Sequence, residues 1–135
     1  MFYKIIRVVF ILISGLIMLR FAFPKLMAKS VSQSTFEMMS EIVPINGAFL
    51  MYFTGFIELV IGVFLLVSLF IKDKIRQTTL RIIGYFLLFC TMIGGLLTEY
   101  FVRPEPKGIL VVIAIVLIII AISELSILSK EKKEL

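Results

Sequence analysis

The chain has 135 residues, of which 61% are hydrophobic and only 17% charged, and its mean hydropathy is +1.13. Soluble domains are about half apolar and about a quarter charged, so too little polar surface remains here to cover a soluble particle, and the same hydrophobicity excludes disorder. The net charge of +5 comes mostly from basic residues at the ends of apolar stretches, which is typical of membrane proteins rather than nucleic-acid binding. We expect an integral protein of the lipid bilayer, with no nucleic-acid partner.

The chain is poor in the residue types that hold metals and redox centres. It has one cysteine, Cys90, and no histidine. A single cysteine cannot form an internal disulfide, and a His/Cys metal site has nothing to be built from. We therefore predict no metal site and no covalently bound cofactor, and we exclude CxxC thiol exchange and His-ligated haem.

Four apolar stretches follow one another along the chain, at about residues 3–23, 47–71, 80–101 and 108–128. Each has the roughly 20 residues that a helix needs to cross about 30 Å of hydrocarbon. A membrane β-barrel would need many more segments with alternating polarity. The sequence predicts a single all-α domain over residues 1–135, an integral membrane four-helix bundle with a charged cytoplasmic tail at 129–135.

The longest polar segment lies between the first two stretches and contains four Ser or Thr residues before an apolar-polar run. One interpretation is a short amphipathic helix at about residues 35–42, which lies at the membrane interface and is ended by Pro44. A plain loop is the other, and the pattern favours neither.

Basic residues are unevenly divided between the two sides of this arrangement. Nine of the 14 Lys and Arg residues fall on the side of the two termini and five on the opposite side. Cytoplasmic loops of membrane proteins carry the excess of Lys and Arg. We therefore predict a protein of the cell (cytoplasmic) membrane with both termini in the cytoplasm.

Each predicted helix carries one stripe of charged or small residues, spaced by the helical period. Such residues tend to face the interior of a membrane bundle. Gly15, Gly55, Gly62 and Gly95 are expected to permit close helix packing. The polar and ionisable members of the stripes are Arg7, Ser14, Lys25, Thr54, Glu58, Arg81, Thr91, Glu99 and Glu124.

The expected depth of these groups separates their roles. Near the cytoplasmic ends, Glu124 is expected to form a structural ion pair with Arg7 or Arg81. Lys25 and Glu99 lie near the outer ends of their helices, where a long cation reaches the headgroups and a carboxylate finds a partner.

Glu58 is the strongest functional candidate, because it lies near the middle of its helix. Ser14 and Thr91 are expected at its depth, Thr54 shares its face, and no cation is expected level with it. Burial disfavours the charged form of a carboxyl, so we predict that Glu58 is neutral and serves as a ligand or proton site. A pair with Arg20, about one turn away in height, is the rival interpretation, and the simplest alternative is that all these groups only hold helices together.

Several short motifs resemble the DoxX family of small four-helix membrane proteins. The stretch from Thr54 to Leu66 is similar to the second-helix signature of that family, and Val43-Pro44 precedes it as expected. Arg7, Ser14-Gly15 and the Phe23-Pro24-Lys25-Leu26 run resemble the first-helix pattern, and Met92 to Thr98 resembles the end of the third helix. Three departures are Glu99, where relatives often carry His, the additional Arg20, and a longer spacing from Gly15 to Lys25.

The resemblance implies the fold and suggests a role. Family members resemble a subunit of a thiosulfate:quinone oxidoreductase, components of oxidative-stress complexes, and an assembly chaperone. It implies an accessory subunit of a quinone- or sulfur-linked membrane redox complex, not an enzyme on its own, with a quinone or lipid-like molecule at Glu58 and a protein partner or a second copy beside it. Two alternatives are a membrane-protein assembly factor and a small proton-coupled transporter, although transporters of this size carry their essential Glu in the first helix, where this chain has none.

Overall fold

A computed structural model of the chain describes residues 2–27, 34, 36–38, 40–41, 46–101 and 108–134. Its long helices are α1 (Phe2–Leu26), α3 (Gly47–Ser68), α4 (Lys74–Phe101) and α5 (Gly108–Glu134). All four are long and apolar enough to cross a membrane, and the described part of the chain contains no strand. The protein is therefore an all-α, multi-pass membrane protein.

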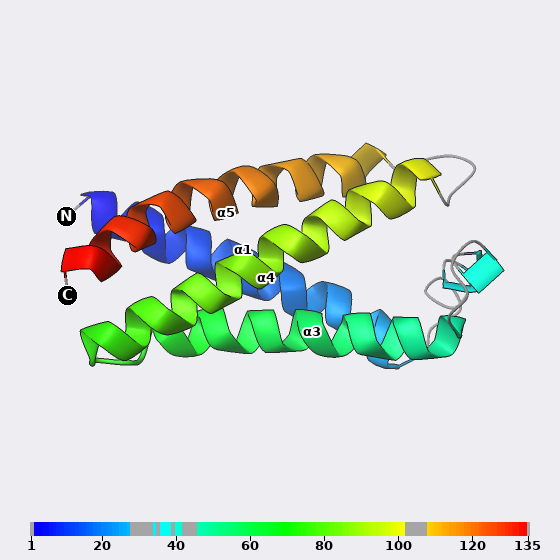
Figure 1. The fold of residues 1–135 in the computed structure, drawn as a ribbon, viewed down its shortest axis with the longest axis horizontal. Coiled ribbons are helices and arrows are strands. Elements are labelled where there is room, and N and C mark those ends of the chain that lie inside the picture. The colour runs from blue at the N-terminus through cyan, green and yellow to red at the C-terminus, as the bar shows by residue number, and fades with distance from the viewer. Residues whose placement is uncertain are drawn as a thin grey trace.

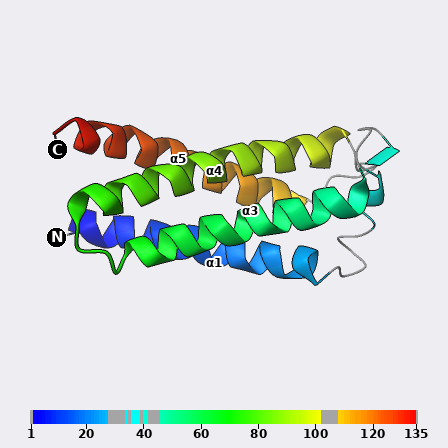
Figure 2. The ribbon, with the colours of Figure 1, turned by 60° about the horizontal axis from the view of Figure 1, so that its bottom comes forward.

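The four helices form an antiparallel bundle in which α1 packs on α3, α3 on α4, and α4 on α5. Figures 1 and 2 place both chain termini and the turn between α3 and α4 at one end, which we call the terminus end. The opposite end, where α1 leads toward α3 and α4 toward α5, is the connector end. An even number of spans requires this arrangement, because each helix reverses the direction of the one before.

The turn between α3 and α4 is fixed by hydrogen bonds from polar side chains. Asp73 caps α4, because its Oδ1 accepts a hydrogen bond from the Ile75 N–H (3.1 Å). The Gln77 side-chain amide donates to the Ser68 carbonyl (3.0 Å) and to the Ile71 carbonyl (3.1 Å). These bonds satisfy backbone carbonyls that the end of α3 leaves without helical partners.

Three helix ends differ from the sequence prediction. The third helix begins at Lys74, not at residue 80, because Asp73 caps it and the polar first turns remain helical at the bundle end. The second ends at Ser68 instead of residue 71. The fourth continues through the predicted tail to Glu134, where Lys132 and Lys133 in its last turn complement the helix dipole.

The first helix also departs from expectation, because it continues through Pro24 to Leu26 instead of ending at residue 23. Proline has no N–H to donate and its ring clashes with the carbonyl four residues before it, so it disfavours a helix at this position. The helix nevertheless continues beyond it. The Met27 N–H bonds to the Phe23 carbonyl (2.9 Å), and the Lys25 ammonium donates to the Phe21 carbonyl (3.3 Å).

The interior of the bundle is built from one stripe of each helix. Ile11 and Met18 of α1 are fully buried, as are Leu88 of α4 and Leu117 of α5. The opposite faces carry exposed Leu, Ile, Val and Phe side chains, which is the pattern of a bundle surrounded by lipid. Of the helix predicted at residues 35–42, positions 36–38 and 40–41 are described and are helical, and the other three positions lie outside the described residues.

Candidate functional site

Glu58 forms an ion pair with Lys25 inside the bundle. The Lys25 Nζ lies 2.8 Å from Glu58 Oε1, and the Glu58 side chain is only 3% exposed. The prediction that no cation lies level with Glu58, and that Arg20 is its nearest rival partner, is wrong. Arg20 faces outward from α1 and is exposed.

The Lys25–Glu58 pair cannot be predicted from the sequence, because it depends on how far α1 and α3 are shifted along each other. A Cβ on Gly55 would lie 2.9 Å from the Lys25 Cβ, so the backbone of α3 meets the last turn of α1 at Gly55. The eight residues from Gly47 to Thr54 therefore extend beyond α1 by about 12 Å at 1.5 Å per residue, and Figure 2 shows α3 reaching farther toward the connector end. Lys25 is near the end of its own helix but level with the middle of α3.

The environment of the pair leaves hydrogen-bonding capacity unused. Glu58 Oε2 is buried and has no hydrogen-bond partner among the described residues. The Lys25 ammonium carries three donors, of which one meets Glu58 and one meets the Phe21 carbonyl, with the Phe21 ring 5.6 Å from Nζ. A buried polar atom without a partner is costly, so this site is suited to a ligand that both accepts and donates hydrogen bonds.

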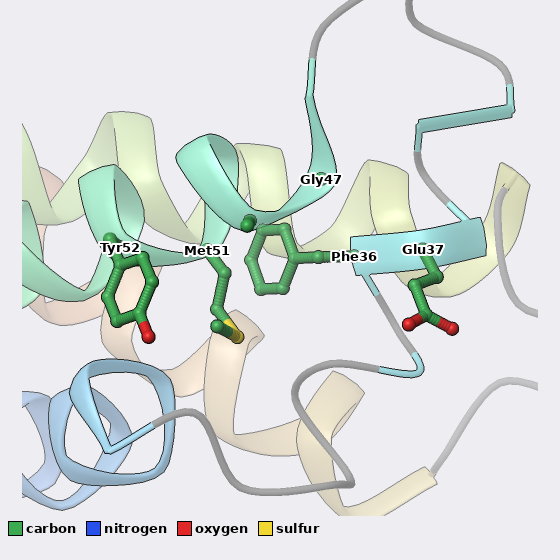
Figure 3. Close-up of a pocket in the computed structure, with 6 residues that line it drawn as sticks. Phe36, Glu37, Gly47, Met51 and Tyr52 are labelled. Carbon is green, nitrogen blue, oxygen red and sulfur yellow. The ribbon is translucent and has the colours of Figure 1, made fainter.

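A cavity of about 220 Å³ lies on the same face of α3, nearer the connector end. Figure 3 shows the side chains of Phe36, Met51 and Tyr52 pointing toward it, with the end of α1 close by. Met51 precedes Gly55 by one turn and Glu58 by two turns on the same face of α3. Gly55, which lies against the last turn of α1, separates the cavity from the Lys25–Glu58 pair. The remaining lining residues are Glu37, Gly47 and Ala48.

The hydroxyl groups predicted around Glu58 are placed unequally. Ser14 is fully buried, and its Oγ has no hydrogen-bond partner within the described ranges. However, its neighbour Gly15 lies against Gly62, so Ser14 is more than one turn from Glu58 toward the terminus end. Thr54 and Thr91 are half-buried.

A second charged cluster at the terminus end joins α1 to α5, and a separate hydrogen bond at the same end joins α4 to α3. Arg7 Nε donates to Glu124 Oε2 at 3.0 Å, and Arg7 also pairs with Glu131, so the predicted ion pair of Glu124 is made with Arg7. Arg81 instead donates from Nε to the Ser68 hydroxyl at 3.2 Å, while Ser68 donates to the Leu65 carbonyl. This network closes the bundle between the first and last helices, which otherwise contact each other little.

Three of the four predicted packing glycines lie at close helix contacts. A Cβ on Gly62 would meet Leu19 at 2.9 Å and the Gly15 carbonyl at 3.0 Å, and one on Gly15 would meet Leu66 at 2.8 Å. Gly95 is the exception: a Cβ there meets no described atom within 4 Å, and the residue is exposed. The reason is that α4 diverges from α3 toward the connector end, as Figure 1 shows, so its contacts with α3 lie earlier, at Gly84 against Leu65.

Glu99 is buried near the connector end of α4 and takes part in the packing there. The described residues contain no group of His, Cys, Asp and Glu side chains able to hold a metal ion. The cavity residues Phe36, Met51 and Tyr52 were missed from the sequence, because large apolar side chains carry no signal that separates a cavity wall from core. The sequence pattern indicates Lys25 as a supporting polar residue, but it does not indicate that Glu58 is its partner.

Comparison of the chain with family models, with characterised proteins and with solved structures found no match.

Proposed function

We propose that this membrane protein is an accessory subunit of a quinone- or sulfur-linked redox complex, and that it holds a quinone-like molecule noncovalently at Lys25 and Glu58. The observation that carries the proposal is the buried pair itself: one carboxylate oxygen is bound to Lys25 and the other, Oε2, has no partner in the described part of the chain. The resemblance of several motifs to the DoxX family also supports this assignment.

The two side chains suit both states of a quinone. A quinone carbonyl only accepts hydrogen bonds, and the Lys25 ammonium has a donor to offer. A quinol hydroxyl also donates, and Glu58 Oε2 is placed to accept. The chain would bind and orient the molecule, while a partner subunit supplies the electrons, because Cys90 is the only cysteine and there is no histidine.

A ligand in the cavity beside Met51 reaches the pair only if the contact of α3 with the last turn of α1 at Gly55 opens. Phe36 and Tyr52 provide aromatic surface for a flat ring, and Met51 is a flexible side chain that adapts to irregular shapes. In the proposed orientation both termini face the cytoplasm, so a ligand enters from the outer half of the cell membrane, by separation of α3 from the end of α1.

Binding of a short-chain ubiquinone analogue to the purified protein in nanodiscs tests the proposal. Glu58→Gln and Lys25→Gln each remove a charge-assisted hydrogen bond, worth about 1.5–3 kcal/mol, so each should weaken binding at least roughly tenfold. Ala48→Trp should weaken it by filling the cavity. The matched control is Arg20→Gln, five residues before Lys25 and on the exposed face of α1, which should bind like the wild type.

Absence of measurable quinone binding by the wild type would refute the proposal. So would equal binding by all the variants, because the ligand would then lie elsewhere in the bundle.

A further inference from the structure

Arg20 is a charged side chain on the lipid-facing surface of a spanning helix. The exposed residues of α1 before and after it are apolar, with Leu16 57% exposed and Phe23 61% exposed. Within the described ranges, no carboxylate lies within ion-pair distance of Arg20, whereas Arg7 and Lys25 of the same helix are both paired with glutamates. A cation facing hydrocarbon is costly, and such a residue points to a function.

The depth of Arg20 favours a phosphate as its counter-ion. Arg20 follows the exposed Lys4 by 16 residues, or about 24 Å of helix rise, in a hydrocarbon layer of about 30 Å. If Lys4 marks one boundary, Arg20 lies about 6 Å inside the other by the same rise. An arginine side chain spans such a distance, so its guanidinium reaches the lipid phosphates at the connector end.

The direction of the side chain strengthens the need for an anion. Cα–Cβ bonds tilt toward the helix N-terminus, so the Arg20 side chain starts toward the middle of the bilayer and must turn back to reach the headgroups. A phosphate drawn in toward the guanidinium satisfies it with paired, charge-assisted hydrogen bonds. The phosphate of a zwitterionic lipid is already accompanied by its own ammonium group, whereas that of an anionic lipid is not.

We propose that Arg20, framed by Leu16 and Phe23 on α1, is a binding site for the phosphate of an anionic phospholipid. The site is independent of the Lys25–Glu58 pair, because Arg20 faces away from the bundle interior. It would fix one lipid against α1 at the connector end of the bundle, where α3 extends beyond the end of α1.

The test measures which lipids contact the protein surface at position 16, one turn from Arg20. Leu16→Cys, on a Cys90→Ser background, carries a fluorophore, and the protein is placed in nanodiscs containing phosphatidylglycerol and phosphatidylcholine. Bromine atoms, which quench the fluorophore, are introduced in the acyl chains of either phosphatidylglycerol or phosphatidylcholine. The ratio of the quenching by the two brominated lipids measures which lipid is enriched at position 16. We expect phosphatidylglycerol to be preferred roughly fivefold, the effect of one cation near an anionic surface.

Arg20→Gln should abolish the preference, and Arg20→Lys should retain part of it, since Lys keeps the charge but loses paired hydrogen bonding. Ile115→Cys on α5 is the matched control: the Arg7–Glu124 pair sets it level with position 16, and it is also exposed. It should show no preference in either background. Excess inorganic phosphate should not change the ratio at position 16.

Three results would overturn the proposal. One is a preference that persists in Arg20→Gln, and another is an equal preference at position 115. The third is loss of the preference together with loss of a dimer on size exclusion, which would assign Arg20 to a contact with a carboxylate of a second protein chain.

Discussion

The guanidinium of Arg7 donates a hydrogen bond from Nε to Oε2 of Glu124, 3.0 Å away, and thereby joins the first helix to the last. The two residues are 117 positions apart, and Glu124 is 1% exposed. Because α1 and α5 touch little elsewhere, this pair is the main polar link that closes the bundle at the terminus end.

Removing one partner of this pair should destabilise the protein strongly. Arg7→Gln leaves Glu124 buried with a lost charge partner, and breaking a buried pair on one side costs about 3–5 kcal/mol. Glu124→Gln should cost less, because Arg7 still pairs with Glu131. The double variant should lose less than the sum of the two. Unfolding in detergent measures all three.

The control for this cycle is Arg76→Gln. Arg76 lies 3.6 Å from Asp73, but its side chain is 81% exposed. Exposed pairs contribute about 0–1 kcal/mol, so the melting temperature should hardly change. Additive losses in the Arg7 and Glu124 variants would mean that the two side chains do not interact in the membrane.

The close contact of α1 and α3 gives a second prediction. Gly62→Leu places a side chain where a Cβ alone would be 3.0 Å from the Gly15 carbonyl, a backbone atom that cannot move independently. Overpacking of this kind costs about 1–3 kcal/mol. Gly95→Leu is the matched change on α4, where a Cβ meets no described atom within 4 Å, and it should be neutral or slightly stabilising. Equal melting temperatures for the two variants would contradict the helix contact.

The glycines show which part of the helix packing can be predicted from the sequence and which part cannot. Helical periodicity and small-residue spacing predict which stripe of each helix is buried, and this holds for Ile11, Met18, Leu117 and Glu124. Periodicity contains no information on how two helices cross. Gly95 shares the stripe of Tyr85 and Leu88 on α4, yet it is exposed because α4 and α3 have separated at that height.

The vertical shift between helices is the second property that the sequence does not contain. Counting residues from the end of each apolar stretch places Lys25 at the membrane edge and Glu58 in the centre. The fit of Lys25 against Gly55 instead sets the two groups at one level. The four spans follow from composition, whereas the site depends on a register that only packing determines.

The Lys25–Glu58 pair gives a third prediction, which reverses the expectation from the sequence. A neutral, unpaired Glu58 would tolerate Gln, but a Glu58 paired with Lys25 would not, since Glu58→Gln strands a largely buried ammonium. Each single change should cost up to about 3–5 kcal/mol, and the double change should cost less than their sum. Arg20→Gln should leave stability nearly unchanged. A stable Glu58→Gln protein would favour the neutral carboxyl.

The last prediction concerns orientation. Both termini and Lys74 lie at one end of the bundle, so a probe that labels one of these positions from one side of the membrane should label the others from that side. The excess of basic residues at the terminus end predicts that this side is the cytoplasm. The measurement uses a membrane-impermeant thiol reagent on single-cysteine variants at Lys74, Ser32 and Glu105, in a Cys90→Ser background.

Lys74→Cys should react only from the cytoplasmic side, and Ser32→Cys and Glu105→Cys only from outside. Ile115→Cys is the control, because its exposed side chain lies level with position 16 of α1, inside the apolar span, and should react from neither side. Labelling of position 32 from the cytoplasm, with position 74 labelled from outside, would invert the orientation while keeping the bundle. Labelling of positions 32 and 74 from the same side would instead contradict α3 as a spanning helix, because α3 is the helix that separates them.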